Sequence, residues 1–330
     1  MAKVSQKDIA EQLNISRVTV TKALQDHPDI ALKTRETVKN KASEMGYVPD
    51  FIGRSLVQGQ TYTIGIILPK IAHSFFASAV EYFYEYANDK GYNIIPMISF
   101  EDPKKEMKNI ETLLSMRVDG IIIDTSGNEG QIDTYGLIKK SGTKFLFFDR
   151  APVNSNDSAV LLNDREASNQ LTKLLISKGY KKICHLTGPE GITITSERCK
   201  GYEDAMNEAA LESLVKTTHM MKRDGYQILM EMAEAGDLPE AIFAANDSVA
   251  HGVYEAAQEL GIQIPKDLAV AGFGDIETSK LLNPPLTTVK IPLKDMAKFT
   301  IQKLIDMIQN DTTTSSRTIF NGELLIRESL

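Results

Sequence analysis

The residues of this chain best placed to bind a small molecule are polar side chains that follow short apolar segments. Four segments, VDGIIID, TKFLFFDR, EAIFAAND and DLAVAGFGD, end in Asp124, Asp149 with Arg150, Asn246 with Asp247, and Asp275. Arg198 begins an amphipathic stretch that follows KKICHLTGPEG, and Phe75 and Phe76 follow TIGIILP. Because open α/β sheets bind ligands at the carboxyl ends of their strands, these residues are the candidates for a binding site.

Each candidate also has a purely structural interpretation. Asp149 can form an ion pair with Arg150 or cap a loop, and Asn246 or Asp247 can cap the helix expected after it. Phe75 and Phe76 can belong to the hydrophobic core. The pattern of residue types therefore leaves both interpretations open for these positions.

Catalytic chemistry is the main alternative use of Asp149, His185 and Asp247 in an α/β enzyme. The sequence contains no G-x-S-x-G nucleophile elbow, P-loop, G-x-G-x-x-G turn or zinc-ligand spacing. The five histidines are scattered, and Cys184 and Cys199 fit reduced structural thiols. We therefore expect no enzyme activity, no cofactor and no metal site.

The elements that position these candidates alternate between apolar segments and amphipathic stretches from Tyr62 onward. Fully apolar, β-branched segments separated by helical stretches indicate parallel sheets covered by helices on both faces. Two such units are expected, at about 62–162 and 163–290. The tail adds a strand and a helix, TTVKIPLKDMAKFTIQKLIDMI, and a closing strand pair around RTIFNGELLIRESL.

The N-terminal residues have a different pattern, which predicts a helix-turn-helix. VSQKDIAEQL places Ile9, Ala10 and Leu13 on one helical face, with Ser5 as N-cap. Ser16 can cap a second helix, Arg17 to Leu24, and a third segment has Thr34 as a candidate cap and Gly46 as a terminator. The second helix of such a unit enters the major groove of DNA. Its exposed side chains are expected to be Arg17, Val18, Thr21 and Lys22.

Charge and hydropathy agree with a DNA-binding head on an acidic body. Residues 1–60 hold nine Lys and Arg and seven Asp and Glu, a net charge of +2. Because the whole chain has a net charge of −7, residues 61–330 carry −9. A solvated surface explains this small excess about as well as a polyanion contact. No run of 18 apolar residues and no apolar signal region occurs. We therefore expect a cytoplasmic protein with no membrane partner.

The segment VTVTKALQDHPDIALKTRETVKNKASEMGYVPDFIGRSL resembles the lactose-repressor (LacI/GalR) family of bacterial transcription regulators. The resemblance extends through essentially the whole chain. It implies a helix-turn-helix head at 1–48, a hinge helix and linker at 49–61, and an effector-binding and dimerisation body at 62–330. That body is a two-lobed, periplasmic-binding-protein-like α/β fold of parallel sheets flanked by helices. Its N-lobe is expected at about 62–162 plus 291–320 and its C-lobe at about 163–290 plus 321–330, with three chain crossings.

The resemblance also implies a DNA contact in the hinge PDFIGRSLVQGQT. Family hinges form a short helix on operator DNA, and a Leu of each subunit wedges into the minor groove. Leu56 matches that Leu, and Arg54 lies beside it. Gly53 stands where the family usually has Ala, which costs roughly 1 kcal/mol of helix stability. Packing of Leu56 against the body is the alternative.

For the effector site, the resemblance matches Arg198 to the Arg that binds ligand hydroxyls or a carboxylate, and Asn246 and Asp149 to polar cleft residues. Phe75 and Phe76 fall where an aromatic ring covers the apolar face of a sugar. Gly274 replaces a family Asp that often binds sugar hydroxyls. Either Asp275 compensates, or the ligand lacks that hydroxyl pattern.

The predicted function is a transcriptional regulator, most simply a repressor, that binds a pseudo-palindromic operator as a homodimer. Arg17, Val18 and Lys22 are expected to contact bases, and Ser16, Thr19 and Thr21 to contact phosphates. A carbohydrate-like effector between the lobes is expected to control operator affinity. The alternatives are an α/β enzyme and a transport-type sugar-binding protein, which would carry a signal peptide and no head.

Overall fold

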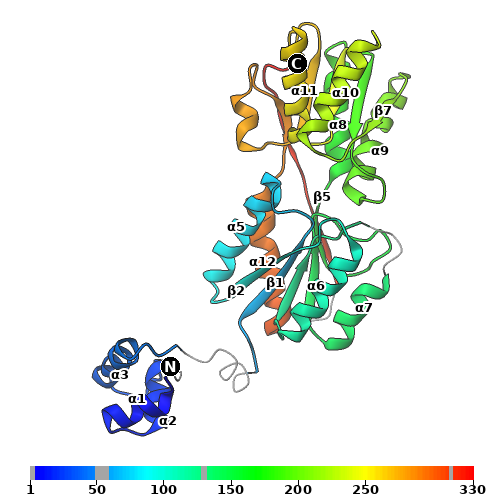
Figure 1. Ribbon diagram of the computed structural model, residues 1–330. Helices are drawn as coiled ribbons and strands as arrows, with labels where there is room; N and C mark the ends of the chain where they lie inside the picture. Colours follow the sequence, from blue (N-terminus) through cyan, green and yellow to red (C-terminus); the bar gives the residue numbers. More distant parts are fainter. Residues whose placement is uncertain (1–3, 49–58, 128–131, 312–314) are drawn as a thin grey trace. The chain divides into compact units, whose positions relative to one another are not determined.

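The structure is a computed structural model that describes residues 4–48, 59–127, 132–311 and 315–330 of the 330-residue chain. The chain divides into two compact units, Met1–Thr61 and Tyr62–Leu330. The first is helical, and the second contains two sheets with flanking helices (Figure 1).

The helical head contains α1 (Gln6–Leu13), α2 (Arg17–Leu24) and α3 (Leu32–Glu44). Ser5 caps α1 in a capping box with Asp8, and Ser16 caps α2 by accepting a hydrogen bond from the Thr19 N–H at 3.0 Å. The three helices pack around six buried side chains, Ile9, Ala10, Val20, Ala23, Val38 and Ala42. The predicted helix-turn-helix is therefore present.

The start of α3 differs from the sequence prediction. Thr34 is not its cap, because the helix begins two residues earlier, after Ala31, and Thr34 lies within its first turn. Ala31 offers no side-chain cap, and its carbonyl accepts hydrogen bonds from the N–H groups of Thr34 and Arg35. The end agrees better with expectation, since Gly46 follows the helix with a φ of +68°.

The first lobe of the body, here the N-lobe, is built on a six-stranded sheet of order β11-β5-β4-β3-β1-β2, and all its pairings are parallel. Its strands are β1 (Thr63–Leu68), β2 (Asn93–Ile98), β3 (Gly120–Ile123), β4 (Lys144–Phe148), β5 (Ala159–Leu162) and β11 (Arg317–Phe320). Helices α5 (Ser74–Asn88) and α12 (Leu293–Gln309) pack together on one face. Helices α6 (Pro103–Ser115) and α7 (Ile132–Ser141) cover the other face (Figure 1).

The second lobe, here the C-lobe, has a sheet of order β12-β10-β9-β8-β6-β7. Its strands are β6 (Ile183–Thr187), β7 (Leu214–Thr217), β8 (Ala241–Ala244), β9 (Ala269–Gly274), β10 (Thr287–Lys290) and β12 (Glu323–Leu325). The helices are α8 (Asp164–Ser177), α9 (Thr193–Glu208), α10 (Lys222–Glu234) and α11 (Asp247–Leu260), with a 3-10 turn, η1 (Glu277–Leu281). The pairs α8–α9 and α10–α11 pack closely, because Gly201 and Gly252 let backbones approach where a Cβ would lie about 2 Å from a carbonyl oxygen.

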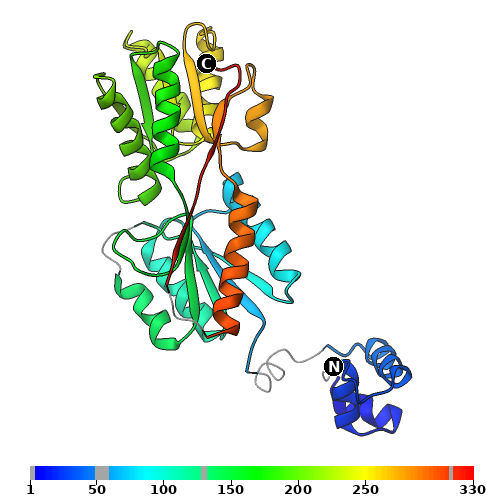
Figure 2. The ribbon, with the colours of Figure 1, turned by 180° about the vertical axis from the view of Figure 1, so that it is seen from behind.

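The chain passes between the lobes three times, after β5, after β10 and between β11 and β12 (Figures 1 and 2). The two strands expected around RTIFNGELLIRESL are present but do not pair with each other: β11 adds to the N-lobe sheet in parallel, whereas β12 pairs antiparallel with β10 in the C-lobe. The predicted parallel α/β architecture is confirmed. The short strands β5 and β7 were not predicted, and β7 lies at a sheet edge with polar, partly exposed residues.

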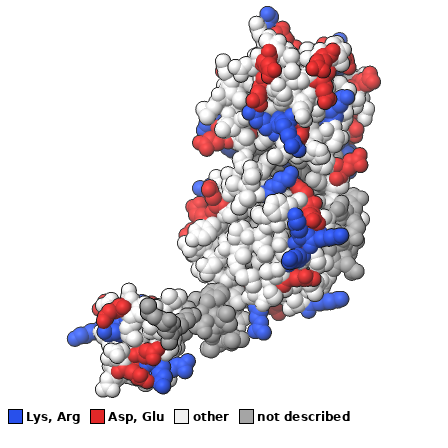
Figure 3. Space-filling model, viewed as in Figure 1, with Lys and Arg blue, Asp and Glu red and all other residues white. Residues whose placement is uncertain are grey.

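No helix among the described residues is long and apolar enough to cross a membrane. The side of the protein drawn in Figure 3 carries basic and acidic side chains interspersed over the body rather than a region of one sign. Cys184 and Cys199 are both free thiols.

Candidate functional site

Helix α2 of the head has one face buried in the core and one face exposed. Val20 and Ala23 are buried, whereas Val18 on the opposite side is 65% exposed. The Arg17 side chain is also exposed, and the part of the head that the structure describes offers it no ion-pair partner. Arg17 and Val18 are therefore free for a partner at the N-terminus of the helix.

The other predicted DNA contacts in α2 make local hydrogen bonds. The hydroxyl groups of Ser16 and Thr19 lie 2.9 Å apart, and the Thr21 hydroxyl donates to Gln6 Oε1 at 2.8 Å. Lys22 Nζ donates to Asp29 Oδ2 at 2.8 Å, and this bond lowers the pKa of Asp29. Arg54, Leu56 and the Gly53 departure lie outside the described residues.

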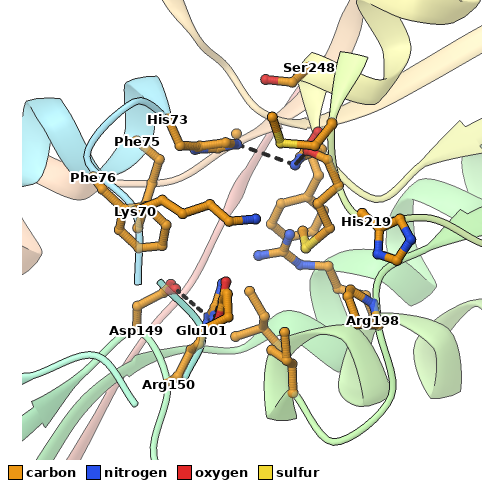
Figure 4. Close-up of a pocket in the computed structure, with 18 of the residues that line it drawn as sticks. Lys70, His73, Phe75, Phe76, Glu101, Asp149, Arg150, Arg198, His219 and Ser248 are labelled. Carbon is orange, nitrogen blue, oxygen red and sulfur yellow. Dashed lines mark hydrogen bonds and ion pairs between the residues drawn. The ribbon is translucent and has the colours of Figure 1, made fainter. Parts of the chain in front are cut away.

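The body contains a cavity of about 440 Å³ between its lobes (Figure 4). The loops that follow β1, β2 and β4 form its N-lobe wall, and α9, the β7–α10 loop and the start of α11 form its C-lobe wall. The cavity thus lies at the carboxyl ends of both parallel sheets, as the sequence predicted for this architecture. Of the predicted residues, Phe75, Phe76, Asp149, Arg198 and Asn246 line it.

Arg198 on the C-lobe wall is held by two hydrogen bonds and an aromatic ring. Its Nε donates to Asp164 Oδ1 at 2.7 Å and its Nη1 donates to the Ala245 carbonyl at 2.8 Å. The guanidinium lies over the Phe273 ring at 3.8 Å from the centroid. Burial raises the pKa of Asp164 to about 6, although Arg198 opposes the shift. These contacts fix the orientation of Arg198 and leave Nη2 for a ligand.

Arg150 occupies the N-lobe wall among three carboxyl groups. Its Nη1 donates to Glu101 Oε2 at 3.0 Å, and its Nε lies 3.4 Å from Asp124 and 3.9 Å from Asp149. The Arg150 Nε and both carboxyl oxygens of Asp124 are buried without a hydrogen-bond partner in the described structure. Burial raises the pKa of Asp149 and raises that of Asp124 well above its ordinary range.

Two residues join the walls directly. Asn246 Oδ1 accepts from the Val249 N–H at 2.9 Å, so Asn246 is the N-cap of α11. Its Nδ2 donates to the Met220 carbonyl at 3.1 Å and lies 3.3 Å from His73 Nε2 on the N-lobe. Burial, followed by the charges of Arg150, Lys70 and Arg198, lowers the pKa of His73 to about 4. His73 is therefore a neutral acceptor for the Asn246 amide at neutral pH.

The two phenylalanines share the first turn of α5 and also contact the core. Phe76 is buried, and its ring packs against Phe75 at 5.2 Å and lies 5.6 Å from the Arg150 guanidinium. Phe75 stacks near Phe148 at 6.4 Å. Both the core interpretation and the cavity interpretation of these rings therefore agree with their position.

Two predicted residues do not line the cavity. Asp124 lies behind the wall, facing Arg150, and Asp275 forms an ion pair with Arg327 Nη2 at 2.6 Å. Asp275 consequently does not occupy the place that a side chain at position 274 would take. Gly274 itself lines the cavity with a φ of +132°, so its backbone conformation, rather than lack of space, disfavours a side chain there.

The sequence reasoning missed several lining residues, among them Lys70, His73, Phe100, Glu101 and Ser248. Lys70 and Glu101 lie two and three residues after the ends of β1 and β2, and Asp149 lies one residue after the end of β4, so the strand-end rule also covers Lys70 and Glu101. Phe100 and Glu101 both have a φ of +57°, which turns the chain toward the cavity after β2. That turn has no glycine or asparagine to signal it.

Comparison with known proteins now identifies the family. The model of the periplasmic binding proteins and sugar binding domain of LacI family matches residues 61–328, and that of bacterial regulatory proteins, lacI family, matches residues 5–50. The chain belongs to the LacI family. The ribose operon repressor of Haemophilus influenzae is 28% identical to it over 327 residues, covering 98% of each chain.

Solved structures agree in fold. The Lac repressor dimer bound to operator and the anti-inducer ONPF has a TM-score of 0.89 at 22% identity over 99% of both chains. A LacI family transcriptional regulator from Enterococcus faecium with bound ribose has a TM-score of 0.73 at 23% identity, covering 81% of this chain and 98% of that one. The protein is therefore a DNA-binding transcriptional regulator, from a family of regulators rather than enzymes.

Proposed function

We propose that this LacI-family regulator is a repressor that binds a pseudo-palindromic operator as a homodimer, under the control of a carbohydrate-like effector in the body cavity. The observation that carries the proposal is the combination in one chain of an exposed α2 N-terminus and a cavity to which both lobes contribute polar and aromatic side chains. The repressor names of its relatives support the sign of regulation.

In the head, we assign base contacts to Arg17, Val18 and Lys22 and phosphate contacts to Ser16, Thr19 and Thr21. Arg17 and Val18 are exposed and need no rearrangement. Lys22 must leave Asp29 to reach a base, so its contribution is reduced by the cost of breaking that exposed pair. In the hinge we assign minor-groove contacts to Arg54 and Leu56 on the family resemblance alone.

In the body, Arg198 is proposed to bind effector hydroxyls or a carboxylate, and Asn246 and Asp149 to bind hydroxyls, with Phe75 and Phe76 against an apolar face of the ring. Arg198 Nη2 is a donor already held in position. The proposed lobe boundaries near 162, 290 and 320 are supported by the crossings after β5, β10 and β11, and the boundary at 61 by the division into two compact units. The boundary at 48 is proposed on the family resemblance alone.

A homodimer is supported by apolar side chains on one side of the body. Tyr84 on α5 is 60% exposed and Leu281 on η1 is 73% exposed. Helix α5 and the orange segment that contains η1 lie on the same side of the body in both ribbon views (Figures 1 and 2). A two-fold contact there would bury both residues and supply the symmetry that a palindromic operator requires.

The two other functions have less support. A transport-type sugar-binding protein has no use for residues 5–50, which match the family's regulatory head. For an enzyme, His185 is fully buried with Nδ1 3.0 Å from the Phe243 carbonyl, away from the cavity lining. Asp247 is held by Ser279, Thr288 and the Ile276 N–H.

A regulator that acts on the chromosome would work in the cytoplasm.

Selection of binding sites from a pool of random duplexes tests this proposal with the full-length chain. We expect two-fold symmetric sites to be enriched. Arg17→Ala should weaken binding to the selected site by about 1–3 kcal/mol and relax the base preference at one position of each half-site. Lys41→Ala is the matched control, because Lys41 pairs with Glu44 on α3. Enrichment of no sequence over the starting pool would refute the proposal.

A further inference from the structure

Lys70 is the cationic side chain of the cavity whose charge the described structure leaves uncompensated. It follows β1 on the N-lobe wall and is half-buried. Its ammonium points into the cavity toward the Arg198 guanidinium, which comes from the opposite lobe (Figure 4). Within the described ranges, Lys70 Nζ has neither an ion pair nor a hydrogen bond, whereas Arg150 and Arg198 each contact at least one carboxylate.

The carboxyl groups that line the cavity are already engaged or face solvent. Glu101 accepts from Arg150, and Asp149 lies beside the same guanidinium. Asp247 is fully buried and accepts three hydrogen bonds from Ile276, Ser279 and Thr288. Glu190 is exposed at the rim. None of the four forms an ion pair with Lys70.

The position of His73 gives a second indication that positive charge gathers here. Arg150, Lys70 and Arg198 all contribute to lowering the pKa of His73, after burial, which means that all three charges act on the same part of the cavity. Cations that face one another across a partly closed cavity repel, and the repulsion grows as water is excluded.

We propose that the effector carries an anionic group, a carboxylate or a phosphate, which binds between Lys70 Nζ of the N-lobe and Arg198 Nη2 of the C-lobe. This inference rests on the proposed function and specifies the chemical class of its effector. Charge-assisted hydrogen bonds from two lobes to one anion are stronger than bonds to a hydroxyl. The remaining polar residues, Asp149 and Asn246, would bind the neutral part of the same molecule.

The anion would also couple binding to the lobes. Without it, Lys70 and Arg198 oppose the approach of the two walls. With the anion bound, both cations are attracted to it, so the protein with its lobes closed binds the effector more tightly than the protein with its lobes open. A ligand shifts a conformational equilibrium only through such a difference in affinity. The anionic group is therefore the part of the effector that shifts the equilibrium toward the closed lobes.

Isothermal titration calorimetry of the full-length protein without DNA, at constant ionic strength, tests this inference. The probes are inorganic phosphate and three matched sets, galactose with galacturonate and galactose 6-phosphate, the corresponding glucose compounds, and ribose with ribose 5-phosphate. We expect phosphate to bind weakly to the wild type, and an acid or phosphate ester to bind at least about tenfold more tightly than its neutral sugar. The carboxylate and ester arms distinguish the two sources of charge.

Variants at Lys70 locate the anion. Lys70→Gln should weaken phosphate binding about tenfold, and Lys70→Arg should retain most of it. Lys298→Gln, at an exposed lysine of α12 with no ion pair in the described structure, should change nothing. Thermal unfolding of each variant shows whether it is folded, and a misfolded Lys70→Gln leaves the Lys70→Arg comparison and the neutral-against-anionic comparison in force.

Two results would overturn the inference. One is phosphate binding that is absent from the wild type or the same in wild type and Lys70→Gln. The other is a neutral sugar that binds as tightly as its anionic counterpart. In the second case the proposed function would survive, because a neutral effector would have been found. Failure of the full-length chain to select any operator would instead remove the proposed function, while the calorimetric comparison would still decide the charge of the ligand.

Discussion

The two walls of the cavity each hold a buried arginine, and the two arginines are held in opposite ways. Arg198 on the C-lobe has one carboxylate, Asp164, a carbonyl acceptor and an aromatic ring beneath it. Arg150 on the N-lobe has three carboxyl groups around it and hydrogen bonds to only one of them, Glu101. In the described structure Arg150 Nε is buried without a hydrogen-bond partner, whereas no atom of Arg198 is.

This difference assigns different tasks to the two walls. A guanidinium that existing hydrogen bonds already hold in position is preorganised, so it loses little conformational entropy when it binds a ligand. A guanidinium whose Nε is buried without a hydrogen bond carries an energetic penalty that a rearrangement can relieve. We infer that the C-lobe wall recognises the ligand and that the N-lobe wall adjusts around it.

Removal of Arg150 should give the largest effect. Arg150→Met leaves Asp124, Asp149 and Glu101 without their cation, and we expect a loss of about 3 kcal/mol in the free energy of unfolding at pH 8. Urea unfolding of the variant and the wild type measures it. A variant as stable as the wild type at pH 8 would contradict the assignment of Arg150 as the charge that holds this wall together.

The same variant has a predicted pH dependence. Burial raises the pKa values of Asp124 and Asp149 in the folded state. A raised carboxyl pKa means that the folded protein binds protons more tightly than the unfolded chain, so this stability is present at low pH and is lost as pH rises through the folded-state value. Loss of Arg150 raises the pKa values of Asp124 and Asp149 further. The difference in the free energy of unfolding between Arg150→Met and the wild type should therefore shrink on going from pH 8 to pH 5.5.

The next largest effect is expected for the Arg198–Asp164 pair, as a coupling free energy between the two residues in the free energy of unfolding. A double-mutant cycle with Arg198→Met and Asp164→Asn is expected to give a coupling free energy of about 2 kcal/mol, because each single variant leaves a buried partner. Additive losses would mean that the 2.7 Å contact contributes nothing specific and that the C-lobe wall is no better organised than the N-lobe wall.

Asp124→Asn should have a small effect, within about 1 kcal/mol. Both carboxyl oxygens of Asp124 are buried without hydrogen bonds in the described structure, and burial already favours the neutral acid. Replacement of Asp164 is the matched comparison on the other wall. A loss above about 2 kcal/mol for Asp124→Asn would show that Asp124 is charged and that Arg150 depends on it.

The smallest expected effect is on the titration of His73, whose pKa is lowered by the charges of both arginines after burial. We expect its imidazole, followed by NMR, to stay neutral from pH 8 to pH 5 and to titrate near 4. Because the charge of Arg150 contributes more to that shift than the charge of Arg198, Arg150→Met should raise the pKa of His73 more than Arg198→Met does. The reverse order would break the proposed distinction between the walls.

The sequence predicted the head more completely than the cavity because the head is built from local signals. Ser5 and Ser16 cap helices within three residues of themselves. The spacing of Ile9, Ala10 and Leu13 placed them on one face, and all three contribute to the core of the head. The exception is Thr34: α3 begins three residues earlier than a cap at Thr34 would place it, because its N-cap position is Ala31.

The cavity was predicted only in part because it depends on chain segments that are far apart. Strand ends located Asp149 and Asn246 correctly at the cavity, and the helix expected after KKICHLTGPEG located Arg198 there. They could not show that Asp275 turns to Arg327, 52 residues away, or that Asp124 lies behind Arg150. Lys70 and Glu101 also follow strands, but charged residues in loops are common, and only the assembled lobes show that these two face the cavity.

The most direct test of the account is the operator affinity of the full-length chain, measured by fluorescence anisotropy without ligand and with a saturating cavity ligand. Coupled sites typically differ by about 5–150-fold in affinity, and we expect a change in that range for the wild type that is lost in Arg198→Lys. An operator dissociation constant that is the same at zero and at saturating ligand would contradict control of the head by the cavity.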